Sequence, residues 1–182
     1  MEAYGTAYKG NMNAVVIFCC GSHCPEEAIT AELERNDIAV IKLSESDECY
    51  RNDADYVAVR IFETVKALPA GMPVGYLGAS AAAAGALIAA AEHPDLVAAV
   101  VSVNGRTDLA IDQLRMVRTP TLLIVNDMPV LRMNREALSL LRGERRLEII
   151  HGTGPEATPA IVNKAARWLV DRVAVGALAV SQ

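Results

Sequence analysis

One serine of this sequence has the surroundings of a nucleophile. Ser80 follows the short apolar run 74–77 and Gly78, and an Ala-rich segment without proline continues from it to Glu92. This order predicts a strand, a sharp turn and a helix. A serine at such a junction has an exposed hydroxyl beside the N–H groups that the first helical turn leaves without partners. The stretch 72–92 therefore indicates nucleophilic chemistry at Ser80.

The turn around this serine nearly has the form G-x-S-x-G of a nucleophile elbow. Its residues are Gly78, Ala79, Ser80, Ala81 and Ala82, so that an alanine stands in the place of the second glycine. Glycines here keep a tight turn from clashing with neighbouring backbone, and alanine is the smallest replacement. The alternative interpretation is that Ser80 is only a small residue at a crowded turn.

A carboxylate and an imidazole follow later apolar runs. A serine hydroxyl is a weak nucleophile unless an imidazole takes its proton and a carboxylate orients that imidazole. Asp127 comes shortly after the run 120–125, and His151 follows the run 146–150. Each has a second interpretation: Asp127 as the N-cap of the next helix, and His151 as a packed or hydrogen-bonded histidine at a strand end.

Three of the four cysteines lie close together, at positions 19, 20 and 24. We interpret them as reduced thiols, because adjacent cysteines do not easily pair with each other. Cys20, His23 and Cys24 are residue types that bind zinc, but a fourth ligand and a second pair are missing, so no metal site is predicted. A Cys20 thiolate beside His23 is a rival nucleophile, and His23 is a rival base for Ser80.

Composition and charge describe a globular protein. The chain has 182 residues, of which 52% are hydrophobic and 21% charged, and its net charge is −5. This length predicts a single domain over residues 1–182. Without a cluster of Lys or Arg, nucleic acid is not an expected partner. The first 13 residues lack the basic and apolar regions of a signal peptide, and no apolar run is long enough to span a bilayer, so we expect a cytoplasmic protein with no membrane span.

Apolar runs and helical patterns alternate about six times along the chain. The predicted strands are 14–18, 38–43, 74–77, 95–103, 120–125 and 146–150. The predicted helices are 25–35, 54–68, 80–92, 109–116, 133–142 and one that ends near Val173, before a tail that we expect to fray. This alternation predicts an α/β fold: a doubly wound, mostly parallel six-stranded sheet flanked by helices. Sites of such sheets lie at the carboxyl ends of the strands.

The sequence resembles the α/β-hydrolase superfamily, and within it the dienelactone-hydrolase-like members, over residues 14–173. The resemblance is carried by PVGYLGAS at 73–80, AAAEHPDLVAAVVS at 89–102, TPTLLIV at 119–125, and the Met-Pro-Val that follows Asp127. The chain length and the motif Ile-His-Gly-x-Gly at 150–154 are also similar to the smallest bacterial lipases. This implies an α/β-hydrolase core of six strands without a lid.

The resemblance implies catalytic roles in the chain order serine, acid, histidine. Ser80 and Asp127 match the first two positions. In related sequences the histidine lies a few residues beyond the last strand, which in this chain corresponds to Gly154 or Pro155, and no histidine follows His151. Either a shortened turn brings His151 into the triad, or the triad is broken.

Stabilisation of the tetrahedral oxyanion needs two convergent N–H donors. The N–H of Ala81, directly after the nucleophile, is the first candidate. The resemblance implies that the second is the backbone N–H of Ser22, after Cys20 and Gly21. Relatives often have histidine where Cys20 stands, but a backbone donor does not depend on that side chain.

Two functions follow from these residues. The first is a serine hydrolase that acts on a small carboxylic ester or related acyl substrate through an acyl-enzyme, with no cofactor. The second is a catalytically impaired member of the same fold that serves as a binding or interaction module, which the unmatched histidine and the altered elbow glycine favour. The N-terminal antiparallel strands of larger relatives are absent, which leaves the strand 38–43 as a sheet edge and predicts a homodimer through it.

Overall fold

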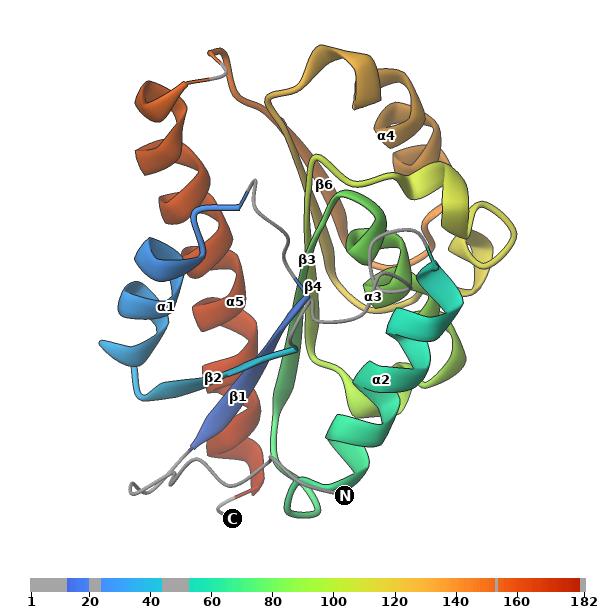
Figure 1. Ribbon diagram of the computed structural model, residues 1–182. Coiled ribbons are helices and arrows are strands. Elements are labelled where there is room, and N and C mark those ends of the chain that lie inside the picture. Colours follow the sequence, from blue (N-terminus) through green and yellow to red (C-terminus); the bar gives the residue numbers. More distant parts are fainter. Residues whose placement is uncertain (1–12, 20–23, 44–52, 153, 181–182) are drawn as a thin grey trace.

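The computed structural model describes residues 13–19, 24–43, 53–152 and 154–180. Its centre is a six-stranded sheet in the order β2-β1-β3-β4-β5-β6, in which every neighbouring pair of strands is parallel (Figure 1). The strands are β1 (Ala14–Cys19), β2 (Ile38–Lys42), β3 (Val74–Ala79), β4 (Ala99–Val103), β5 (Thr121–Val125) and β6 (Arg145–Ile149). The predicted doubly wound α/β sheet is confirmed, and it is wholly parallel.

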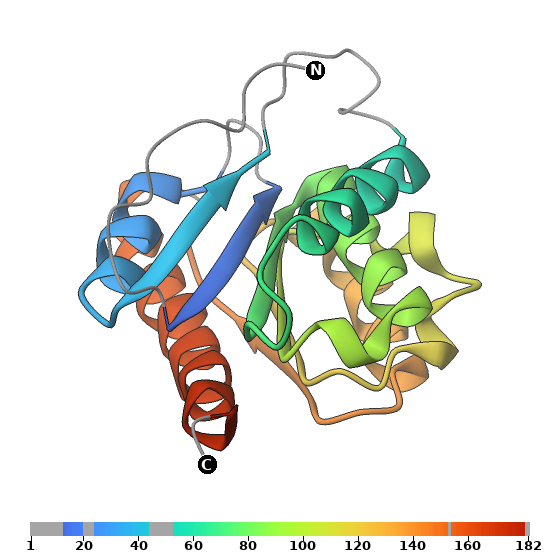
Figure 2. The ribbon, with the colours of Figure 1, turned by 90° about the horizontal axis from the view of Figure 1, so that it is seen from below.

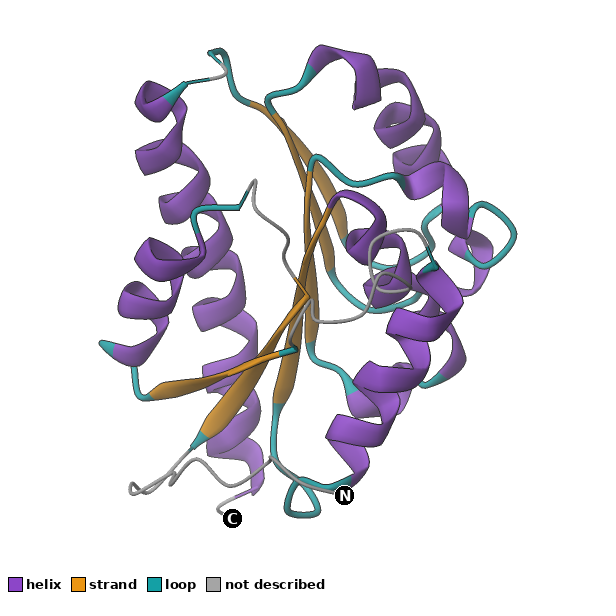
Figure 3. Ribbon diagram, in the orientation of Figure 1, coloured by secondary structure: helices purple, strands orange, loops and turns teal. Residues whose placement is uncertain are grey.

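Helices cover both faces of this sheet. Figures 1 and 2 show α1 and α5 on one face and α2, α3 and α4 on the other, and Figure 3 shows the strands as the layer between them. The α-helices are α1 (Glu26–Glu34), α2 (Ala54–Lys66), α3 (Ser80–Glu92), α4 (Met128–Leu140) and α5 (Thr158–Val180). Short 3-10 turns are η2 (Pro94–Leu96), η3 (Thr107–Ala110), η4 (Leu114–Met116) and η5 (Pro155–Ala157).

The strands have continuous apolar runs because both faces of the sheet are covered. In β1, Val15 and Ile17 belong to the core cluster under α2 and α3, whereas Val16 and Phe18 belong to the cluster under α1 and α5. Every residue of β1 is buried. A strand buried on both faces cannot show the alternation of polar and apolar residues that marks a half-exposed strand.

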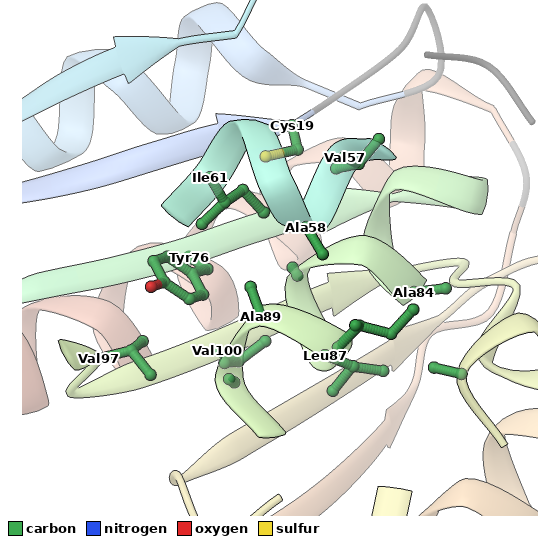
Figure 4. Close-up of a cluster of buried hydrophobic side chains, with 14 of the residues drawn as sticks. Cys19, Val57, Ala58, Ile61, Tyr76, Ala84, Leu87, Ala89, Val97 and Val100 are labelled. Carbon is green, nitrogen blue, oxygen red and sulfur yellow. The ribbon is translucent and has the colours of Figure 1, made fainter. Parts of the chain in front are cut away.

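Helix α3 packs unusually close to its neighbours because its residues are small. All its residues from Ala81 to Ala91 are buried. A Cβ atom on Gly85 would lie 2.5 Å from the Cβ of Val57, so α2 approaches α3 where only glycine fits. Figure 4 shows Val57 of α2, Leu87 of α3 and Tyr76 of β3 in the same cluster of buried side chains. Burial holds the pKa of Tyr76 well above its usual value, so its hydroxyl stays neutral.

Some predicted boundaries were wrong. The strand expected at 95–103 begins only at Ala99, because Pro94 starts the 3-10 turn η2. The helix expected from Met133 begins at Met128, since a proline in the first turn removes only an N–H that has no intrahelical acceptor. The helix expected at 109–116 consists of the turns η3 and η4. The tail expected to fray after Val173 continues α5 to Val180.

The two edges of the sheet differ in their side chains. Strand β6 has exposed Arg145 and Arg146, and Arg146 forms a 2.7 Å ion pair with Glu148. Strand β2 occupies the other edge, as predicted, and its sequence is Ile-Ala-Val-Ile-Lys. Charged residues discourage pairing at an edge, and β2 has fewer of them than β6. None of the helices in the described ranges combines the length and apolar character needed to cross a membrane.

A homodimer through the β2 edge therefore remains our prediction. Size-exclusion chromatography with light scattering at micromolar concentration should give twice the 19.4 kDa mass of the chain. A monomer mass at that concentration would remove the prediction.

Candidate active site

The parallel register brings the ends of four strands to one edge of the sheet. Ala79 is paired with Val103, Val103 with Ile124, and Val125 with Ile149. Ser80 follows β3 directly, while Asp127 and His151 each lie two residues beyond the last residues of β5 and β6. Neighbouring strands are about 4.8 Å apart, so β3 and β5 are separated by roughly 10 Å. The predicted nucleophile, acid and base thus belong to the same edge.

Ser80 has a strained backbone. It is exposed and is the first residue of α3, and its φ angle is +52°. This left-handed conformation is costly for residues other than glycine, and it persists only where the surroundings impose it. The carbonyl oxygen of Ser80 accepts a 2.9 Å hydrogen bond from the N–H of Arg106. That bond fixes the turn against the loop that follows β4.

The two glycine positions of the elbow motif differ in their need for glycine. A Cβ atom on Gly78 would lie 2.6 Å from the Cα atom of Ala83, which is too close for any side chain. Ala82, by contrast, is accommodated with its side chain buried. The departure from G-x-S-x-G therefore leaves the turn itself intact.

One predicted oxyanion donor lies at the start of α3. Ala81 is in the first helical turn, where N–H groups have no acceptor within the helix and the helix dipole is positive. The other predicted donor, Ser22, lies outside the described residues, as do Cys20 and His23. Cys24 carries a free, partly buried thiol. Within the ranges that the structure describes, no group of three or more His, Cys, Asp or Glu residues could hold a metal ion.

The carboxylate of Asp127 is not used as a helix cap. Asp127 is exposed and occupies the N-cap position of α4, but its side chain makes no capping hydrogen bond. The capping interpretation is therefore wrong for the side chain, although Asp127 does occupy the position directly before α4, which begins at Met128. The carboxylate remains available for another partner.

His151 is exposed just beyond the last strand. The N–H of Ile150 donates to the carbonyl oxygen of Val125 at 2.8 Å, which continues the β5–β6 pairing up to His151. The interpretation of His151 as a packed residue is therefore wrong. Among the described residues, no hydrogen bond or ion pair joins the side chains of Ser80, Asp127 and His151, so their grouping as a triad stays a prediction. Catalytic hydrogen bonds are often long in the absence of substrate and form in the complex.

Sequence reasoning missed two asparagines at this edge. Asn104 follows β4 and Asn126 follows β5, and both are half-buried. The Nδ2 atom of Asn104 donates to Oδ1 of Asn126 at 2.6 Å. Asn104 has a φ angle of +48°, a conformation that asparagine adopts more readily than most residues. The signal in the sequence was that an asparagine directly follows each of two apolar runs.

An ion pair lies next to the elbow turn. The guanidinium of Arg106 donates to both carboxylate oxygens of Asp108, at 2.9 and 2.8 Å. This hydrogen bonding raises the pKa of Arg106 and lowers the pKa of Asp108. Both side chains are exposed, so the pair contributes little to stability, but it orders the first residues of η3 beside Ser80.

Several solved structures of hydrolases are similar to this chain. The crystal structure of a dienelactone hydrolase from Anabaena variabilis is 32% identical to this chain, with a TM-score of 0.77 over 89% of this chain and 88% of that one. Two more distant structures share the fold: a CIB-like hydrolase from Thermoplasma acidophilum (18% identity, TM-score 0.71, 88% of both chains) and Est1E from Butyrivibrio proteoclasticus with bound ferulic acid (12% identity, TM-score 0.72, 91% and 92% of the chains). The two more distant structures show that the fold is shared.

Two relatives from Mycobacterium tuberculosis strains have a different name. Each is a "Putative phosphoribosyl transferase" that is 35% identical over 159 residues, which is 81% of this chain but 33% of the relative. The chain thus spans about a third of the length of the curated relatives it matches. No protein-family model matches the chain.

The left-handed backbone at Ser80 predicts that glycine gives a more stable protein than alanine at this position, which is the reverse of their order within a helix. Ser80→Gly should be more stable than Ser80→Ala by about 1 kcal/mol, because only glycine adopts this φ angle without steric cost. At Ser139, which is exposed in the right-handed helix α4, alanine should instead be the more stable by about 1 kcal/mol. Urea denaturation of the four variants gives the free energies of unfolding. The same order at both positions would contradict a left-handed Ser80.

Proposed function

We propose that this chain, which belongs to the dienelactone hydrolase family of α/β-hydrolase-fold proteins, is a serine hydrolase. Its substrate would be a small carboxylic ester or a related acyl compound. The observation that carries this proposal is the backbone of Ser80, which is exposed and left-handed at the β3–α3 junction. Strain of this kind is concentrated at functional sites, because elsewhere it costs stability without benefit. A strand-to-helix elbow presents its serine hydroxyl in this conformation.

In the first half of the proposed reaction, the enzyme becomes acylated. The Oγ atom of Ser80 attacks the ester carbonyl carbon while the ring of His151 takes the hydroxyl proton, and Asp127 orients the ring. The carbonyl oxygen becomes an oxyanion, which the N–H groups of Ala81 and Ser22 stabilise. The C–O bond to the alcohol then breaks, and the alcohol leaves with the proton from His151.

In the second half, water releases the acid. His151 takes a proton from a water molecule, whose oxygen attacks the acyl carbon. The second oxyanion collapses, the bond to Ser80 breaks, and the serine oxygen recovers its proton from His151. The products are a carboxylic acid and a regenerated enzyme, so no cofactor is needed. We propose a small-molecule acyl substrate because, in the described part of the chain, the segment between β4 and η3 is too short to hold a lid over the strand ends.

Two features of the edge support these roles. The carboxylate of Asp127 is exposed and makes no capping bond, so no other interaction in the described residues competes for it. His151 is exposed immediately beyond Ile150, whose N–H is bonded to β5. The acid and the base therefore stand on neighbouring strands.

The second candidate function is a binding module with an impaired triad. It is favoured by the absence of a hydrogen bond between the described side chains of Asp127 and His151. Phosphoribosyl transfer is not our proposal, because the chain covers 88% of the dienelactone hydrolase but only 33% of the relatives with the transferase name. Their name describes proteins of which the matched part is only a third.

Hydrolysis of a short-chain p-nitrophenyl ester at mildly alkaline pH separates the two functions. We expect the wild-type chain to turn over, and Ser80→Ala and His151→Ala to lose roughly a million-fold in kcat. Asp127→Asn should lose about ten-thousand-fold, because the ring of His151 would no longer be held in the reactive tautomer.

The matched control is Ser139→Ala, which removes an exposed serine hydroxyl from α4 and should leave kcat unchanged. Loss of activity in Ser80→Ala but not in His151→Ala would indicate another base, with His23 the first to test. A wild-type chain without activity would favour the binding module.

A further inference from the structure

We propose that Asn104 and Asn126 are positioning residues that fix the acid Asp127 and the base His151 of the proposed triad relative to each other. This inference rests on the proposed function and names the side chains that fix its geometry. Asn104 follows β4, the strand between the nucleophile strand β3 and the acid strand β5. Its side chain can therefore reach the loop that carries Asp127.

Asn104 first fixes the backbone at Asp127. The Oδ1 atom of Asn104 accepts hydrogen bonds from two consecutive backbone N–H groups, that of Asn126 at 2.9 Å and that of Asp127 at 3.1 Å. A backbone that continued the strand would point these N–H groups in opposite directions. One amide oxygen thus fixes the bend by which the chain leaves β5 at Asp127.

The second fixed segment is the turn that contains His151. The Nδ2 atom of Asn104 donates to Oδ1 of Asn126 at 2.6 Å, and Nδ2 of Asn126 donates to the carbonyl oxygen of Gly152 at 3.1 Å. On the other side of His151, the N–H of Ile150 donates to Val125. His151 is therefore held by hydrogen bonds to the β5 segment both before and after it.

The backbone of Asn104 supports the same interpretation. Its φ angle of +48° departs from the strand, while its own N–H still donates to the carbonyl oxygen of Ile124 at 2.8 Å. The sheet pairing is therefore already complete without the side chain. In the described part of the chain, the amide of Asn104 bonds to Asn126 and Asp127, and the side chain of Asn126 continues to Gly152 beside His151.

This geometry predicts a loss in kcat rather than in substrate binding. Asn104→Gly keeps the left-handed backbone accessible and removes all three side-chain hydrogen bonds. We expect kcat for the p-nitrophenyl ester to fall about 100-fold, as small misplacements of catalytic groups do, with KM within about threefold of wild type. Asn104→Asp keeps the acceptor for both N–H groups but loses the donor to Asn126, so it should recover part of that loss.

Asn126→Asp tests the link to the histidine turn alone. It keeps the acceptor for Asn104 and loses the donor to Gly152, so kcat should fall about 10-fold, less than in Asn104→Gly. Matched controls are Asp37→Gly, at an exposed left-handed residue far from the site, and Asn36→Asp, at an exposed asparagine whose Nδ2 bonds to Glu32. Both controls should keep wild-type kcat.

The assays are run well below the thermal midpoint of each variant, so that unfolding does not lower the rate. Wild-type kcat in Asn104→Gly would overturn the inference while the hydrolase stands. A loss in Asn104→Gly that Asn104→Asp does not recover, or one that appears equally in KM, would overturn it too. A wild-type chain that does not hydrolyse the ester, or whose activity survives Ser80→Ala, would overturn the proposed function itself. That result is distinguishable from an unexpected order of kcat among the Asn104 and Asn126 variants.

Discussion

The sharp turn from β3 into α3 is the constraint on which the candidate site depends. Within a few residues the chain leaves a fully buried strand and enters a helix whose residues 81–91 are all buried, so the turn has no space in which to relax. Gly78 is pressed against Ala83, and the backbone of Ser80 is left-handed. The surrounding packing thus maintains a costly conformation that exposes one hydroxyl at the edge of the sheet.

The second constraint is that all strands are parallel. Their carboxyl ends meet at one edge, so residues far apart in the sequence become neighbours there. The elbow on β3 is tied to the loop after β4 through Arg106, and that loop is tied through Asn104 to the loops after β5 and β6. The candidate nucleophile, acid and base therefore stand on one hydrogen-bonded edge rather than on independent loops, which is the condition for a preorganised site.

Local patterns in the sequence predicted the sheet and the elbow. Runs such as 14–18 and 120–125 are long, apolar and bounded by polar residues, and Ser80 stands between an apolar run and an Ala-rich helix, so each could be recognised without knowledge of the rest. The starts of β4 and α4 were missed, because Pro94 begins a 3-10 turn and Pro129 is tolerated in a first helical turn. The role of Asn104 could not be predicted, because its partners are about twenty or more residues away and become neighbours only through the order of β4, β5 and β6.

The proposed function requires Ser80 to be an activated nucleophile. A serine-directed fluorophosphonate, followed by intact-protein mass spectrometry and peptide mapping, tests it most directly, because the reagent needs an activated hydroxyl but no knowledge of the natural substrate. We predict one adduct on the wild-type chain, located on the peptide that contains Ser80, and none on Ser80→Ala. An unlabelled wild-type chain, or an adduct that persists in Ser80→Ala, would contradict the account.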